Sequence, residues 1–313
     1  MFKTFQMELA GRPLIIETGK MAKQANGAVL VRYGDTVVLV ATTASKEPRE
    51  GTDFFPLTVD YEEKMYAVGK MPGGFLRREG RPGNSAILNA RLIDRPIRPL
   101  FDKRCRNDVH VVATVLSVDY DNAPELCGML GASASIGISD IPWDGPIAGV
   151  RIGRVDGKYV VNPTQEQLAE SSMNITVAGS EEAIMMVEGG ANEAPEEEVL
   201  DAIMFGHETI KELCRFQKKI IEEVGKPKRT MVFPEVPEEI DEAVAAYATE
   251  DLKKAIFDAD KLRRDGNIDA VKKAAKEHFA DIYPENGADV AESLDHLTKQ
   301  IVRDSISTEG IRP

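Results

Sequence analysis

Residues 73–82, GGFLRREGRP, place two large apolar side chains and three arginines among glycines and a proline. Glycine and proline favour turns and loops, because they adopt or fix backbone angles that regular strands and helices do not use. A loop gains no folding free energy by presenting Phe75 and Leu76 to water. The segment therefore predicts a binding surface with apolar side chains for packing and arginines for an anion.

The charge distribution indicates which kind of partner such a loop would bind. The chain of 313 residues has a net charge of -13, yet the stretch from Lys70 to Arg106 holds ten basic and three acidic residues. A concentrated basic patch on an acidic protein confines a polyanion to one place. Most of these cations are arginines, which suit bidentate phosphate contacts and stacking on bases.

Composition excludes several other classes of protein. Apolar residues make up 42% and charged residues 29% of the chain, which is typical of a soluble globular protein. No apolar run is long enough to span a membrane, and the first residues lack the pattern of a secretion signal. Three widely spaced cysteines favour a reducing, cytoplasmic location, and no cysteine or histidine pair has the spacing of a zinc site. The four histidines stand singly, and we expect them to be structural or solvent-facing.

The residue pattern predicts an α+β domain followed by an all-α domain. We expect two β-hairpins, at 27–44 and at 148–164, where the second turns at Asp156-Gly157. A helix should begin at Asn84 or Ser85 and end at Pro96. Further expected elements are strands at 54–60, 108–120, 174–179 and 183–190, a small-residue helix within 125–142 that lies very close to a sheet, and a long amphipathic helix within 194–227.

These elements imply three segments along the chain. Residues 1–226 form the α+β domain, residues 227–237 form a linker, and residues 238–313 form the all-α domain. The abrupt stop at STEGIRP suggests a chain that is cut before a further domain.

Four motifs together resemble the N-terminal part of the bacterial polynucleotide phosphorylase family: GGFLRREGRP, LIDRPIRPLF, GASASIGISDIPWDGPI and VVNPTQ. The resemblance covers the chain from Met1 to Pro313. It implies a first RNase PH-like domain, with mixed sheets and helices like domain 2 of ribosomal protein S5, and then an all-α domain. A second RNase PH-like copy would follow.

The resemblance also implies an activity. The family degrades RNA from its 3′ end with inorganic phosphate as co-substrate, releases nucleoside diphosphates, and acts in mRNA degradation. It uses magnesium and assembles as a homotrimeric ring in the cytoplasm, with single-stranded RNA and other RNA-degradation proteins as partners and no membrane.

In this family the loop typically reads Phe-Phe-Arg-Arg and lines the constriction of the ring's channel. Here it reads Phe75-Leu76-Arg77-Arg78, so one stacking platform is reduced to an apolar contact. With Arg81, these residues form the expected RNA-binding loop. A loop whose phenylalanine packs back on its own domain is the alternative.

A second group of arginines, Arg91, Arg95 and Arg98, has the spacing of one helix face, although Pro96 interrupts it. These residues either line the RNA path or pair with Asp94, Asp102 and acids across a subunit contact. Both interpretations remain open at this level.

The motifs of the family's catalytic copy are missing from this chain. Its Asp-x-Lys, which precedes Val-Ala-Gly, is replaced by Asn174 and Thr176, and a further aspartate falls on Leu168. An amide and a hydroxyl do not supply the charges that a magnesium ion and a phosphate need. We therefore expect no catalytic residue, no metal ligand and no bound cofactor here, with the magnesium ligands in the missing second copy.

Acidic residues replace the family's serine-rich phosphate loop. Asp119, Asp121 and Glu125 would repel an anion at that place. They either cap and form turns, which is the more frequent role of such carboxylates, or bind a metal of their own.

The sequence thus predicts the non-catalytic N-terminal half of a phosphorolytic exoribonuclease, which guides RNA and builds the ring. Its acidic helical faces argue against RNA contact by residues 238–313. Two alternatives remain: an independently active RNase PH-like nuclease, and a purely structural interaction module.

Overall fold

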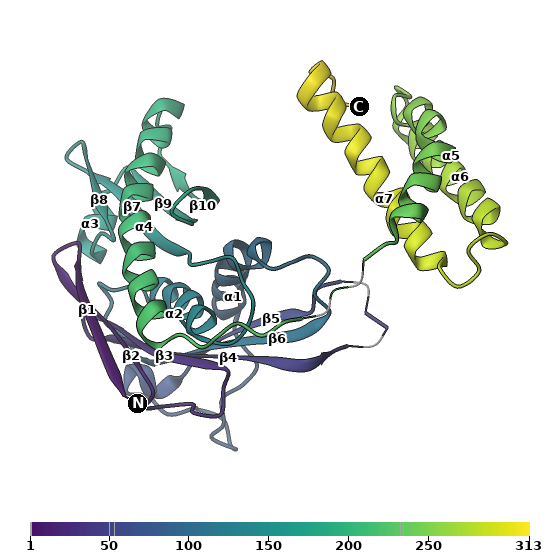
Figure 1. The fold of residues 1–313 in the computed structure, drawn as a ribbon. Helices are drawn as coiled ribbons and strands as arrows, with labels where there is room; N and C mark the ends of the chain where they lie inside the picture. The colour runs from purple at the N-terminus through teal and green to yellow at the C-terminus, as the bar shows by residue number, and fades with distance from the viewer. Residues whose placement is uncertain (1, 50, 53, 232, 234) are drawn as a thin grey trace. The chain divides into compact units, whose positions relative to one another are not determined.

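The chain forms two compact units, Met1–Phe233 and Pro234–Pro313, in the computed structural model (Figure 1). The structure describes residues 2–49, 51–52, 54–231, 233 and 235–313. Each unit has its own apolar core.

The first unit contains a six-stranded sheet in the order β1-β2-β3-β4-β6-β5. Neighbouring strands are antiparallel except β5 and β6, which run parallel. The expected hairpin at 27–44 is confirmed, since β3 and β4 pair from Gly27 and Thr42 to Tyr33 and Thr36. The strands are β1 (Lys3–Leu9), β2 (Arg12–Thr18), β3 (Gly27–Tyr33), β4 (Thr36–Pro48), β5 (Leu57–Glu63) and β6 (Asn107–Ser117).

A four-stranded antiparallel sheet in the order β10-β9-β7-β8 completes the β structure. The second expected hairpin is also confirmed, and its turn places Asp156 and Gly157 at φ values of 50° and 75°. Such left-handed angles match the twist of the flanking strands. The strands are β7 (Ala148–Val155), β8 (Lys158–Val161), β9 (Met173–Gly179) and β10 (Ile184–Ala191).

Helices connect and cover these sheets. They are α1 (Asn84–Ile97), α2 (Pro124–Ile138), α3 (Gln165–Glu170) and α4 (Glu196–Val224), with 3-10 turns η1 (Met65–Val68) and η2 (Arg98–Leu100). The prediction that Pro96 ends its helix was wrong by one residue, because α1 continues to Ile97. A proline this near the helix end blocks only one backbone hydrogen bond, the one to the carbonyl of Leu92, so the helical phase persists up to Arg98.

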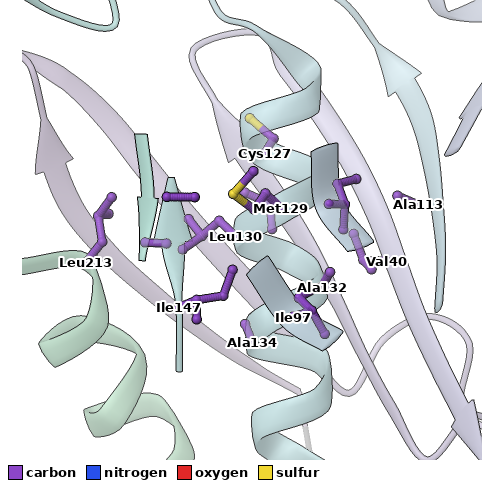
Figure 2. Packing of buried hydrophobic residues seen from close by; sticks show 14 of the residues in the cluster. Val40, Ile97, Ala113, Cys127, Met129, Leu130, Ala132, Ala134, Ile147 and Leu213 are labelled. Atoms are coloured by element: carbon purple, nitrogen blue, oxygen red, sulfur yellow. The ribbon is translucent and has the colours of Figure 1, made fainter. Parts of the chain in front are cut away.

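Helix α2 lies between the two sheets and forms the centre of the core (Figure 2). Every residue from Leu126 to Ile138 is buried. A Cβ atom on Gly131 would lie 2.5 Å from Val40 Cγ2, and one on Gly27 would lie 2.0 Å from the Ser135 carbonyl oxygen. Such distances leave no room for a side chain, so these glycines allow the helix and the six-stranded sheet to approach closely.

Serines on α2 satisfy the polar groups that this burial would otherwise leave unpaired. Ser133 Oγ accepts a hydrogen bond from the Ile147 backbone N–H at 2.9 Å. The hydroxyls of Ser135 and Thr42 bond at 2.6 Å. A buried polar group without a partner costs about 1–3 kcal/mol, so these pairs fix α2 against both sheets.

The segment after α4 is bound to the first unit, although its residues from 227 onward were expected to form the linker. The Lys228 ammonium donates to the carbonyls of Ile136, Gly137 and Ser139, at 3.1, 2.8 and 2.8 Å. The Arg229 backbone N–H donates to the Asp140 carbonyl at 2.8 Å. Because α2 ends at Ile138, Lys228 donates to carbonyls at and just beyond the C-terminal end of the helix, where backbone acceptors lack their usual partners four residues on. Partial burial lowers the pKa of Lys228.

The second unit consists of α5 (Glu238–Ile256), α6 (Lys261–Ala280), α7 (Gly287–Asp304) and a terminal π-helical turn, η3 (Ser305–Glu309). Residues such as Ile240, Val244 and Leu294 form its buried core. None of the helices within the described ranges combines the length and apolar character that a membrane crossing requires.

We expect Gly131→Leu to lower the free energy of unfolding of the first unit by about 1–3 kcal/mol or more, because the new side chain would clash with Val31 and Val40. Trp143 is the chain's one tryptophan, so its fluorescence during urea unfolding reports on this unit alone. Gly190→Ala, which meets open space, is the control, and its effect should stay within about 0.5 kcal/mol. Equal midpoints for both variants would contradict the close packing of α2.

Candidate RNA-contact loop and degenerate pocket

The loop between η1 and α1 presents its apolar and cationic side chains to solvent. Phe75 is fully exposed and Leu76 is 71% exposed. Arg77 N–H donates to the Gly74 carbonyl at 2.9 Å, and Arg77 has a φ of 47°. A non-glycine residue in this left-handed region is uncommon. This tight turn holds Phe75 and Leu76 outward, so in this chain the phenylalanine does not pack back on its own domain.

Two contacts anchor the loop at its base. The Glu79 carboxylate accepts a hydrogen bond from the Met65 backbone N–H at 3.0 Å. Gly69, at a φ of 68°, caps η1 by donating to the Tyr66 carbonyl at 3.0 Å. Phe75 to Arg78, at the tip of the loop, therefore lie between two residues, Gly69 and Glu79, that are hydrogen-bonded to η1.

The arginines divide into two groups by their contacts. Arg77, Arg78, Arg81 and Arg91 form no ion pair with any residue in the described ranges. All four are exposed, so their guanidinium groups are free to meet an external anion.

The remaining two arginines are engaged within the protein. Arg95 pairs with Glu188 on β10. Arg98 forms two hydrogen bonds with the Asp94 carboxylate, at 3.0 and 2.7 Å, and donates to the carbonyls of Phe55 and Leu57. The sequence left two interpretations open for these arginines, RNA contact and pairing with acids. Arg98 pairs with Asp94, and both residues belong to the same chain. RNA contact by Arg95 or Arg98 stays a prediction that would require them to exchange these partners.

Arg91 continues the surface of the loop along α1. Ile87 and Leu88 are 50% and 61% exposed, and they lie four and three residues before Arg91 on the same face of the helix. Beside them lies a hollow of about 340 Å³ between α1 and β5, which Arg91 also lines. Apolar and cationic groups thus alternate here as they do in the loop.

The position that corresponds to the family's catalytic residues is occupied by internal charge pairs. Thr176 is buried at the centre of β9 and stands opposite Arg151 on β7 and Glu188 on β10. Residues paired across strands project to the same face. Arg151 pairs with Glu125 at 2.6 Å, and Glu188 pairs with Arg95. Each charge beside Thr176 is therefore neutralised within the protein.

Asn174 and Leu168 lie near this strand without forming a charged site. Asn174 is exposed on β9 between Gly153 and Gly190, and Leu168 lies half-buried on α3. Both positions lack a carboxylate.

Asp119 and Asp121 precede α2 and have structural contacts, whereas Glu125 lies in the first turn of α2 and pairs with Arg151. Asp119 accepts hydrogen bonds from the Asp121 backbone N–H at 3.1 Å and from Asn122 Nδ2 at 2.6 Å, and these bonds hold its pKa below the usual range. Asp121 accepts from the Gln165 backbone N–H at 3.0 Å. These contacts are those of turn formers, as the first of the two interpretations expected.

The residues around Thr176 do not fit magnesium. In the described ranges no group of three or more His, Cys, Asp or Glu side chains is arranged to hold a metal ion. Glu125 is bonded to arginine, and position 174 carries an amide. We therefore derive no catalytic step through a metal in this chain.

Arg12, Arg151 and Glu188 are residues of this region that the sequence reasoning missed. Arg12 stacks on Tyr33 at 4.7 Å and donates to the Asp121 carbonyl and to Asn122 Oδ1, both at 2.9 Å. Their partners are 21 to 150 positions away along the chain. Arg151 and Glu188 stand opposite Thr176 on neighbouring strands, a pairing that no predicted hairpin contained.

Three family models match the chain in succession. Residues 10–142 match the 3′ exoribonuclease family, domain 1, and residues 145–209 match domain 2 of the same family. Residues 239–313 match the polyribonucleotide nucleotidyltransferase RNA binding domain. The last description runs against our expectation that the acidic helical unit makes no RNA contact.

Individual proteins that resemble this chain in sequence bear the name of the third of these families. Polyribonucleotide nucleotidyltransferases of Heliobacterium modesticaldum and Syntrophomonas wolfei are each 56% identical over 99% of this chain, and that of Brevibacillus brevis is 54% identical over 100% of this chain. The chain spans 44% of the length of each. Rice Rrp46 shares the fold, with a TM-score of 0.52 at 14% identity over 71% of this chain and 94% of its own.

The exposed loop, the two-sheet architecture and these matches lead to one conclusion: the chain belongs to the polyribonucleotide nucleotidyltransferase family and corresponds to its N-terminal, RNase PH-like and helical portion.

Proposed function

We propose that this chain is the RNA-guiding, ring-building half of a phosphate-dependent 3′-to-5′ exoribonuclease that acts in cytoplasmic mRNA degradation, and that its own pocket is catalytically silent. The observation that carries the proposal is the loop tip, where Phe75 and Leu76 are exposed beside the unpaired Arg77 and Arg78. Magnesium and inorganic phosphate would act at the second copy. The whole enzyme would be a homotrimer that works with other RNA-degradation proteins.

The chemistry of the tip suits single-stranded RNA without regard to its sequence. Every base offers a flat face to Phe75, and base–aromatic stacking contributes about 1–3 kcal/mol per base. Arg77 and Arg78 neutralise phosphates and release counterions, which makes binding depend on salt. Leu76 adds apolar contact without a ring.

The silent pocket follows from the neutralised charges beside Thr176. Phosphorolysis needs a cation to hold the attacking phosphate and a metal to offset charge on the scissile group. Arg151 is engaged by Glu125, and Arg95 is engaged by Glu188. With Asn174 and Thr176 in place of Asp and Lys, no group remains to activate or orient the nucleophile.

The helical unit is a second candidate for RNA contact, because the model that matches it describes RNA binding. Helix α6 carries more basic than acidic residues. Several of its cations are already paired, Arg263 with Asp258 and Lys272 with Asp295. We therefore propose that the loop at residues 73–82 contributes more to RNA affinity than helix α6.

We expect the double variant Arg77→Ala/Arg78→Ala to bind oligo(A) RNA more weakly and with less dependence on salt. Each lost phosphate contact lowers the slope of log K against log salt by about 0.7, so the slope should fall by about 1.4. Fluorescence anisotropy at several salt concentrations measures both quantities.

The matched control is Lys158→Ala/Lys219→Ala, which removes the same charge from two exposed lysines of the first unit. It should keep the salt slope of the unchanged chain. If the two double variants lose affinity equally, only net charge matters, and the assignment of RNA binding to the loop is wrong.

Leu76→Phe should strengthen binding to oligo(A), because it restores a second stacking surface at a side chain that already points into solvent. We expect a gain of about fivefold or more in affinity, which corresponds to the lower end of the stacking energy. Leu76→Met, which has no ring, serves as the control. Equal affinities for the two variants would exclude stacking at position 76.

The chain should release no nucleoside diphosphate from RNA in the presence of phosphate and magnesium. Chromatography of the reaction over hours, beside a complete polyribonucleotide nucleotidyltransferase, checks this. Release that disappears in Glu125→Gln or Arg151→Gln would show that the pocket does chemistry and would overturn the silent assignment.

A further inference from the structure

A second cationic surface lies at the opposite end of α2 from the degenerate pocket. It is a hollow of about 640 Å³ whose lining includes Lys23, Lys46, Lys226 and Arg229. Asp140, just beyond the C-terminus of α2, lines it as well. Since α2 has 15 residues, this hollow is about 20 Å from Glu125 at the other end of the helix.

The charges of this hollow are not balanced within the described part of the chain. Four cations face one carboxylate there, and none of the four takes part in an ion pair. Asp140 Oδ1 instead accepts a hydrogen bond from Asn26 Nδ2 at 2.8 Å. An excess of three positive charges therefore remains in a concave site on an acidic protein.

Arg229 contributes to the hollow a guanidinium group that forms no ion pair with any described acid. Its Nε and Nη2 atoms are inaccessible to solvent and have no hydrogen-bond partner. Buried donors of this kind are nearly always satisfied, because an unpaired one costs about 1–3 kcal/mol, and more for a charged group. A ligand in the hollow cannot reach atoms that solvent does not reach, so these two donors are not its contacts and Arg229 would act on an anion through its charge.

The walls of the hollow are held in place by hydrogen bonds. Asn26 joins three segments, because its Oδ1 accepts from the Ala44 N–H at 3.0 Å, its Nδ2 donates to Asp140, and its carbonyl accepts from Lys226 Nζ at 2.6 Å. The Arg229 backbone is bonded to Asp140, and Lys228 is bonded to the end of α2. A ligand would meet cations whose backbone is already ordered, which reduces the entropic cost of binding.

A neighbouring hollow of about 520 Å³ has a different lining. It shares Lys23, Asn26 and Lys226 with the first, but it adds Met21, Ile138 and Val224. Its remaining ions, Lys3 and Glu223, pair with each other at 2.5 Å. The combined site therefore has a cationic end and an end with apolar side chains.

We propose that these joined hollows bind a nucleotide that carries a di- or triphosphate. The phosphates would lie against Arg229, Lys46, Lys23 and Lys226, and the base would lie against Met21, Ile138 and Val224. A diphosphate carries about the charge that would balance the site's three excess positive charges. The site is separate from the loop at residues 73–82 and does not rest on the proposed RNA function.

Isothermal titration of the 313-residue chain with ADP, with and without magnesium, tests the proposal. We expect saturable binding of one ADP per chain, and competition by inorganic pyrophosphate with weaker affinity because pyrophosphate has no base. Arg229→Gln and Lys46→Gln should each weaken ADP binding by about tenfold or more, since each removes a charge-assisted contact.

Neither substitution removes an internal side-chain hydrogen bond that the structure shows, and unfolding followed by Trp143 fluorescence verifies that each variant folds. Lys158→Gln, an exposed lysine on β8, is the control and should bind ADP unchanged. Arg77→Ala/Arg78→Ala should also bind ADP unchanged, which separates this site from the RNA loop.

Three results would overturn the proposal. The first is no binding of ADP at millimolar concentration. The second is ADP binding that Arg229→Gln and Lys46→Gln leave intact, which would place the nucleotide elsewhere. The third is equal affinity for ADP and pyrophosphate, which would exclude recognition of the base.

Discussion

The burial of α2 on all sides is the constraint on which the rest of the first unit depends. A helix between two sheets requires small residues where strands approach, as at Gly131 against Val40, and a partner for every polar group, as at Ser133 and Ser135. These contacts fix the position of both ends of α2. The N-terminal end then places Glu125 beside Arg151, and the C-terminal end receives Lys228. The two polar regions of the unit are therefore set by one packed helix.

Ion pairing separates the arginines that hold the protein together from those available to a ligand. Arg95 and Arg98 join α1 to β10 and to the chain before β5, so their charges are already neutralised. Arg77, Arg78 and Arg91 lie where no described acid reaches them. On a chain of net charge -13 these exposed cations remain available because they form none of the ion pairs found among the described residues. The same reasoning applies to Lys46 and Arg229 at the other end of α2.

The strands around Thr176 show how charged side chains can be engaged within the fold. Strand β9 keeps its place between β7 and β10, so Thr176 still faces the residues that neighbouring strands contribute. Those residues are now Arg151 and Glu188, each engaged by an opposite charge. Internal pairs of this kind stabilise the fold only modestly once their desolvation is counted. Their main effect here is to leave no free charge for a phosphate or a metal.

The sequence by itself determined the α+β pattern, the hairpins, and the loop with its apolar and cationic residues, and it shows Asn174 and Thr176 before Val177-Ala178-Gly179. These features depend on local chemistry: periodicity, turn residues and the identity of single side chains. Only the tertiary structure decided which cations are free, because Arg95, Arg151 and Arg12 meet partners 21 to 150 positions away. It also decided that Pro96 lies inside α1 and that Lys228 and Arg229 pack on α2. Contacts between distant segments follow from how the sheets enclose α2, and no short stretch of sequence contains that information.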